Sequence, residues 1–405
     1  MNRSTAPNRR ERFPREALRR LTLGVVACAL LGASDDATTR DAMRRLLGGL
    51  EQLLPLSLDE SAFGDPARAA SIRSQLDVLA ASASAVSAHA ARRDRGIRYL
   101  GRGLEMEARQ ARELFDLGAL TASRYSLLQI TEYCVACHSR LPDAEDPTLA
   151  RRLTDRARGE IDAAQRAHLE IATRQFDRAL ETLEASLAEP GLGGLDLLGQ
   201  VTSYLVVAIQ VKQDFERPVP TLRRIAEKPD VWTHLRRDVR SWIDALDALA
   251  KRAATSDRLE DAVAVIDAGR STIGFPSDRR ALVHYVAASG VLQRFLEREG
   301  PSPQDRARAY YLLGVVESRI GSTYALSLPS FYLETAIRED PGGRVAEPSY
   351  AMLEELTLCE FSLDCAASPG ELPPDVEVYL EDLRALAAGE RTARDVPDPL
   401  NPTDR

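Results

Sequence analysis

The sequence predicts an all-α protein, with an up-down four-helix bundle followed by an α-solenoid of helix pairs. Apolar residues recur at intervals of three and four along most of the 405 residues, which is the spacing of one helix face. Prolines and glycines interrupt these stretches at short intervals, and none of them shows the alternation of a strand. The length favours two domains, and an apolar share of 44% is enough for large cores.

The N-terminus has the pattern of an export signal. Six arginines between positions 9 and 20 precede the apolar run Leu21–Leu31, and the small residues Gly32–Ser34 follow. We therefore expect residues 1–34 to be a signal peptide and the protein to be periplasmic. The run is too short to span a bilayer comfortably. A lipid anchor at Cys28 stays open as an alternative, although the apolar residues after it argue against a lipoprotein processing site.

Four helical patterns predict the bundle, which we expect to occupy residues 36–142. Pro55 should end the first helix, a loop should follow from Ser57 to Pro66, and Pro142 should close the fourth helix. Short connections make neighbouring helices antiparallel. The expected helices span 38–54, 69–92, 96–117 and 121–140.

The fourth helical pattern contains the segment Cys134-Val135-Ala136-Cys137-His138. C-x-x-C-H is the attachment sequence of haem c: the two thiols form thioethers with the porphyrin, and the histidine ligates the iron. A zinc site would need a second pair of ligands nearby, and a thioredoxin-like motif would need βαβ surroundings. The sequence therefore predicts one covalent haem held by Cys134, Cys137 and His138.

A haem motif late in the fourth helix of a bundle resembles the cytochrome c′ family. The resemblance covers roughly residues 36–141 and rests on the three motif residues, their late position and the helix order. The chain departs from the family after the motif, where Ser139–Pro142 replaces the usual aromatic and arginine. Arg140 is the remaining arginine that could serve the haem propionates.

The resemblance leaves two states for the sixth position on the iron. In cytochrome c′ it is open and binds small gases, whereas in low-spin relatives a methionine of the first helix fills it. Here Met43 lies on the inward stripe of the first helix and is the expected distal ligand, with an adaptable core methionine as the alternative. Met106 lies off the main stripe of its helix, and His89 near an inward face; both are weaker candidates.

The region 150–390 reads as helix pairs and predicts an α-solenoid. The stretch Leu169–Leu187 resembles the second half of a tetratricopeptide repeat, and Ala309–Gly314 resembles the first half of another. Such repeats stack and commonly bind a peptide or protein, so we expect a protein partner here, with a purely structural domain as the alternative. Residues 391–405 read as a polar disordered tail.

The remaining chemistry-bearing residues indicate little catalysis. An exported chain favours a disulfide between Cys359 and Cys365, with two buried thiols as the alternative. Isolated histidines at 168, 234 and 284 read as surface or core residues, and no nucleophile elbow, phosphate loop or dinucleotide fingerprint is present. A net charge of −8 argues against nucleic-acid binding.

These observations predict an exported monohaem c-type cytochrome that transfers electrons and is not an enzyme. A redox partner protein, a protein bound by the helical repeats, or both would be its partners. A five-coordinate sensor of nitric oxide or carbon monoxide, and a scaffold that haem merely stabilises, stay open as alternatives.

Overall fold

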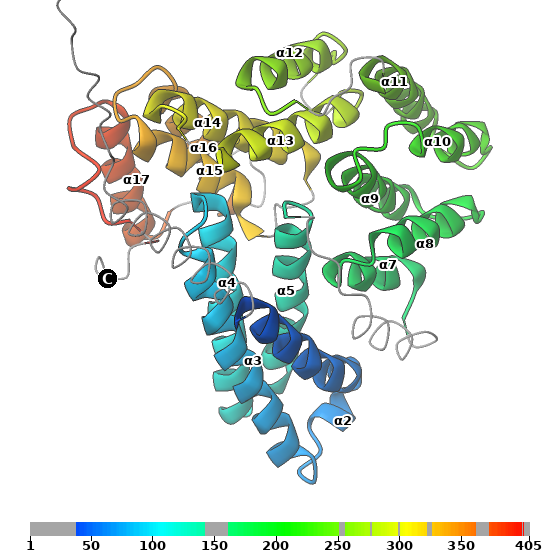
Figure 1. Ribbon diagram of the computed structural model, residues 1–405, viewed down its shortest axis with the longest axis vertical. Helices are drawn as coiled ribbons and strands as arrows, with labels where there is room; N and C mark the ends of the chain where they lie inside the picture. The colour runs from blue at the N-terminus through cyan, green and yellow to red at the C-terminus, as the bar shows by residue number, and fades with distance from the viewer. Residues whose placement is uncertain are drawn as a thin grey trace, which may run out of the picture.

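The computed structural model describes residues 38–141, 161–250, 256–275, 278–298, 300–321, 326–361, 372–398 and 400. Every regular element within these ranges is helical, which confirms the predicted all-α class (Figure 1). The predicted signal peptide, including Cys28, lies outside the described residues.

The N-terminal helices surround one apolar core. They are a first helix over 38–58, α2 (Glu60–Phe63), α3 (Ala69–Ala90), α4 (Arg95–Asp116) and α5 (Leu120–His138). The first helix lies obliquely across the other long helices (Figure 1). An up-down four-helix bundle is therefore not confirmed and stays a prediction. The core comes mainly from Leu46, Leu50, Leu53, Ile72, Leu76, Leu79, Leu104, Ala108, Leu127 and Ile130.

The prediction that Pro55 ends the first helix is wrong, because the helix continues to residue 58. The hydroxyl of Ser57 donates to the carbonyl of Leu54 at 2.8 Å, and Arg124 of α5 donates to the carbonyl of Ser57 at 2.6 Å. These two side chains therefore provide hydrogen-bond donors for backbone carbonyls in the last turn of the first helix. The expected loop also contains α2, whose Phe63 is fully buried edge-on against Phe115.

Two glycines give a matched test of how closely the N-terminal helices pack. A Cβ added at Gly101 of α4 would lie 2.5 Å from the Cβ of Ala90 on α3, whereas one at Gly48 would meet nothing within 4 Å. Gly101→Ala should therefore lower the free energy of unfolding by about 1–3 kcal/mol, since the helices must separate. Gly48→Ala should raise it by about 0.5–1 kcal/mol through helix propensity. Urea unfolding checks both, and equal effects at the two sites would contradict the packing.

The helices after residue 161 curve into an arch, with α7, α8 and α9 at one end and α16 and α17 at the other (Figure 1). One stretch of the described chain, Gly194–Val211, is long and apolar enough to cross a membrane, but 56% of it is buried in the protein. The arch is formed by α7 (Ala163–Ala172), α8 (Phe176–Ala188), α9 (Gly194–Leu205), η1 (Val206–Val211), α10 (Pro218–Glu227), α11 (Thr233–Ala250), α12 (Leu259–Arg270), α13 (Leu282–Glu297), α14 (Pro303–Ile320), α15 (Leu328–Glu339), α16 (Ala346–Glu360) and α17 (Pro374–Ala387).

The stretch Leu169–Leu187, which resembles half of a tetratricopeptide repeat, comprises the end of α7, a turn and α8. Arg174 forms that turn in the left-handed backbone region, at φ 59°. Pro218 and Pro220 lie in the first turn of α10, where a proline has no helical hydrogen bond to lose.

The ends of α4 and α5 enter the concave side of the arch, so the two predicted domains share a core (Figure 1). Ile97 and Ala136 belong to the same apolar cluster as Tyr332 of α15. The ring of Tyr99 stacks on Phe331 at 4.2 Å between centroids, and its hydroxyl donates to the carbonyl of Leu326 at 2.9 Å. The arch therefore holds the end of α5 that carries the haem motif.

The expectation of a disordered tail over 391–405 is wrong for the described residues. Val396 and Leu400 are buried, and Asp398 forms an ion pair with Arg95 of α4 at 2.9 Å. Arg338 of α15 also donates to the carbonyl of Val396 at 3.2 Å. Paired charges and buried apolar side chains outweigh the polar composition that suggested disorder.

Candidate haem attachment site

The three motif residues lie in the last two turns of α5. Spacings of three and four place Cys134, Cys137 and His138 on one broad side of that helix. All three side chains are half-buried. The neighbouring helix α7 packs against α5 and supplies the contacts of the histidine.

The imidazole of His138 is held in the tautomer that a metal ligand needs. Its Nδ1 lies 2.8 Å from the carbonyl oxygen of Ala172 at the end of α7. A carbonyl only accepts hydrogen bonds, so Nδ1 carries the proton and Nε2 keeps its lone pair. Burial, together with the charge of Arg174, lowers the pKa of His138 to about 3, so the ring is neutral at physiological pH. This second contact is the kind that orients metal-bound histidines.

The two cysteines are free thiols with different surroundings. Cys134 packs against the core of the N-terminal helices, and Cys137 against the core shared with the arch. Burial, with the neighbouring thiol second, raises the pKa of Cys134 to about 12, and burial raises the pKa of Cys137 to about 11. Redox-active C-x-x-C pairs need a lowered thiol pKa, so this environment argues against thioredoxin-like chemistry.

These donors fit haem c. Two protonated thiols are available for thioether bonds, and one neutral imidazole presents Nε2 to an iron. The described residues include no group of three or more His, Cys, Asp or Glu side chains arranged to hold a metal ion. The zinc alternative therefore has no support in this part of the chain.

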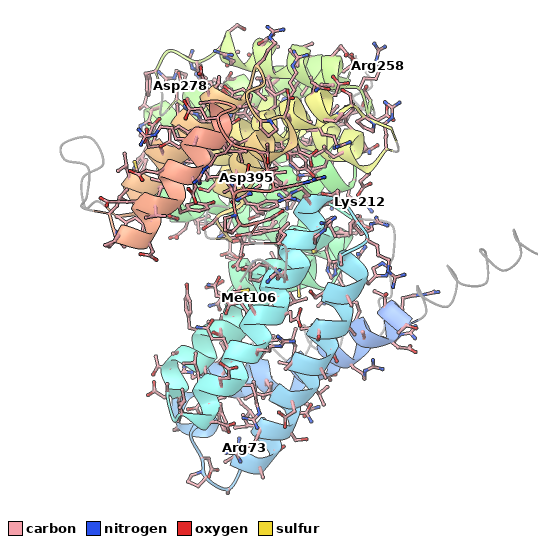
Figure 2. All side chains as sticks on the ribbon, turned by 90° about the vertical axis from the view of Figure 1, so that its left-hand side faces the viewer. Arg73, Met106, Lys212, Arg258, Asp278 and Asp395 are labelled. Atoms are coloured by element: carbon pink, nitrogen blue, oxygen red, sulfur yellow. The ribbon has the colours of Figure 1, made fainter. Side chains whose placement is uncertain are left out.

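The candidates for the sixth position differ in their surroundings. Met43 is half-buried and packs against the same apolar cluster as Cys134. Met106 is 51% exposed on the surface of α4 (Figure 2). His89 lies in the last turn of α3, and its Nδ1 is buried without a hydrogen-bond partner among the described residues. Of the two methionines, only Met43 lies against the cluster that one motif cysteine contacts.

Arg140, which the sequence offers as a partner for a haem propionate, already has three hydrogen-bond partners in the protein. Its guanidinium donates to the carbonyl of Ala136 at 2.7 Å, to Glu317 of α14 at 3.3 Å and to the hydroxyl of Tyr332 at 3.3 Å. Burial alone would lower the pKa of Arg140, but Tyr332 and Glu317 outweigh it and raise that pKa. The sequence gave no signal for this ion pair, because its partners are 177 positions apart.

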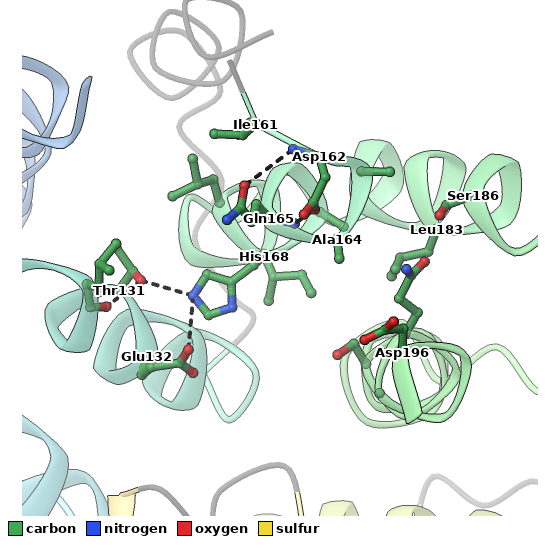
Figure 3. Close-up of a pocket in the computed structure, with 18 of the residues that line it drawn as sticks. Thr131, Glu132, Ile161, Asp162, Ala164, Gln165, His168, Leu183, Ser186 and Asp196 are labelled. Atoms are coloured by element: carbon green, nitrogen blue, oxygen red, sulfur yellow. Dashed lines mark hydrogen bonds and ion pairs between the residues drawn. The ribbon is translucent and has the colours of Figure 1, made fainter. Parts of the chain in front are cut away.

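A cavity of about 850 Å³ lies beside the motif, between the first helix, α5, α7, α8 and α9 (Figure 3). Thr131 and Glu132 of α5 border it, whereas the three motif residues do not. His168 of α7 reaches across to both, with its Nε2 3.0 Å from the Thr131 hydroxyl and 3.6 Å from the Glu132 carboxylate. We had interpreted His168 as an isolated surface or core residue.

The other predicted residues are placed as follows. Cys359 is disulfide-bonded, and its predicted partner Cys365 lies outside the described residues. His284 is buried in α13, and no partner of its Nδ1 is found in the described ranges. His234 lies at the start of α11, beside the ring of Trp232. Of the described residues, Cys359, His234 and His284 do not line the cavity.

Comparisons with known proteins add no relative. No family model, no curated protein and no solved structure matches this chain.

Proposed function

We propose that the protein is an exported monohaem c-type cytochrome that transfers electrons. The observation that carries the proposal is the hydrogen bond from Nδ1 of His138 to the carbonyl of Ala172, next to two free thiols at the spacing of haem attachment. The raised pKa values of the two half-buried thiols argue against thiol redox chemistry, which needs a lowered thiol pKa, and both sulfurs are free to form thioethers.

The bound group would supply one-electron redox chemistry at its iron. Cys134 and Cys137 would hold its edge against two apolar clusters, which exclude water from that side. His138 would be kept neutral and oriented by Ala172, and Met43 would fill the distal position. A thioether ligand stabilises the reduced iron and raises the potential.

The first role of the arch would be to hold α5, the helix that contains the C-x-x-C-H segment, in place. The concave side of the arch is occupied by the ends of α4 and α5. A redox partner would then dock on another face of the molecule.

A purified protein from a host with the haem-attachment machinery should have the mass of the processed chain plus one haem, with a Soret band. The double variant Cys134→Ser, Cys137→Ser should lose both, because no thioether can form. Val135→Ala changes the same motif but keeps its donors, so it should retain covalent haem. Mass spectrometry under denaturing conditions checks all three. A wild-type protein with the bare chain mass would overturn the proposal.

A further inference from the structure

The cavity beside α5 has an apolar rim that no other part of the described chain covers. Three large apolar side chains on its edge are exposed: Leu58 by 43%, Leu128 by 45% and Leu195 by 79%. They come from the first helix, α5 and α9, so the rim spans both halves of the molecule. Cavities of roughly 300–1,000 Å³ hold small ligands, and this one has about 850 Å³.

The charged groups that the described residues bring to the cavity wall are of one sign. Four carboxylates line it, from Glu132, Asp162, Glu189 and Asp196, and no described lysine or arginine does. Within the described ranges none of the four forms an ion pair with a lysine or arginine. His168 contacts Glu132 but is neutral at physiological pH, because burial lowers its pKa. The wall therefore favours a cation.

A second observation, independent of the charges, points to a hydrogen-bond donor. Gln200 of α9 lines the cavity, and only 8% of this residue is exposed. Its Oε1 is buried and has no hydrogen-bond partner among the described residues. A buried acceptor without a donor is unfavourable, so a ligand that donates an N–H to it would bind more tightly.

We propose that this cavity binds an amphipathic primary ammonium compound. Its apolar body would lie along Leu58, Leu128 and Leu195. Its ammonium group would donate to Gln200 and lie near the carboxylates, with Glu132 the least exposed of them. The inference uses no residue of the haem motif and does not rest on the proposed electron transfer.

Calorimetric titration of the mature holoprotein with octylammonium tests the proposal. Octylammonium should bind with a stoichiometry of one. Octyltrimethylammonium keeps the charge but has no N–H, and should bind about fivefold more weakly, the equivalent of one hydrogen bond. Octanoate keeps the chain but reverses the charge, and should not bind. Equal affinity for all three would reveal a non-specific apolar surface and overturn the proposal.

Variants locate the site. Gln200→Met keeps the volume and removes the acceptor, and should weaken octylammonium about fivefold while making it no better than the trimethylated compound. Glu132→Gln should weaken both cations by about threefold to tenfold. Glu113→Gln removes an exposed carboxylate of α4 outside the cavity wall and should change nothing. Unchanged affinity in both cavity variants would overturn the proposal.

A basic segment of the chain itself could compete with the ammonium compound for the cavity. Arg151, Arg152, Arg156 and Arg158 precede Ile161, which lines the cavity. A variant in which these four arginines are changed to serine tests this alternative. If the variant binds octylammonium and wild type does not, the arginine-containing segment occupies the cavity in wild type. That result would also overturn the proposal.

Discussion

Arg140→Met is expected to lower the free energy of unfolding by about 3–5 kcal/mol, the usual cost of removing one partner from a buried ion pair. The side chains of Arg140 and Glu317 are only 5% and 2% exposed, so solvent screens their attraction little. Without the guanidinium, Glu317 keeps the hydroxyl of Ser289 at 2.6 Å but loses the positive charge of Arg140. Chemical denaturation of the holoprotein measures the change.

A second variant separates the ion pair from simple loss of packing. Arg140→Met combined with Glu317→Gln removes both charges, and should recover part of the loss because no uncompensated charge stays buried. Arg258→Met breaks a surface pair with Glu260, in which both side chains are about two-thirds exposed. It should change stability by less than about 1 kcal/mol. A double variant as unstable as the sum of its single variants would contradict the pairing.

Met43→Leu is expected to convert a closed haem into one that binds carbon monoxide. Leucine keeps most of the volume of methionine in the apolar cluster, so the fold should survive, but it has no sulfur for the iron. Met43 packs against the same apolar cluster as Cys134, one of the two motif cysteines. The ferrous absorption spectrum with and without carbon monoxide measures the change.

The wild-type spectrum decides between the proposed carrier and a gas sensor. We expect the wild-type protein to show sharp low-spin bands that do not change when carbon monoxide is added. Met106→Leu should leave these bands unchanged because the side chain of Met106 is on the surface. A broad high-spin spectrum that already responds to the gas in wild type would remove Met43 as a ligand. It would also favour the five-coordinate alternative.

Local patterns were sufficient to predict α5, which contains the motif, and the two long helices that precede it. The stripes of α3, α4 and α5 place their ends within two residues of the expected positions. The errors occurred where a tertiary contact overrides a local preference. Pro55 does not end its helix, because Ser57 and Arg124 provide partners for the carbonyls near it. The described part of the tail is packed because Arg95 and Arg338 hold it and because Val396 and Leu400 are buried.

From the sequence alone came the all-helical class and the C-x-x-C-H donors, since both depend on spacings within a few turns of one helix. The choice of Met43 also needed the resemblance to the low-spin relatives of the cytochrome c′ family. Only the tertiary structure decided that the arch encloses the end of α5, that Ala172 orients His138, and that Arg140 pairs with Glu317. It also decided that Gln200 and Glu132 line one cavity. These contacts join residues that are 34 or more positions apart, and the spacing of apolar residues along one helix contains no information about which distant helix will cover it.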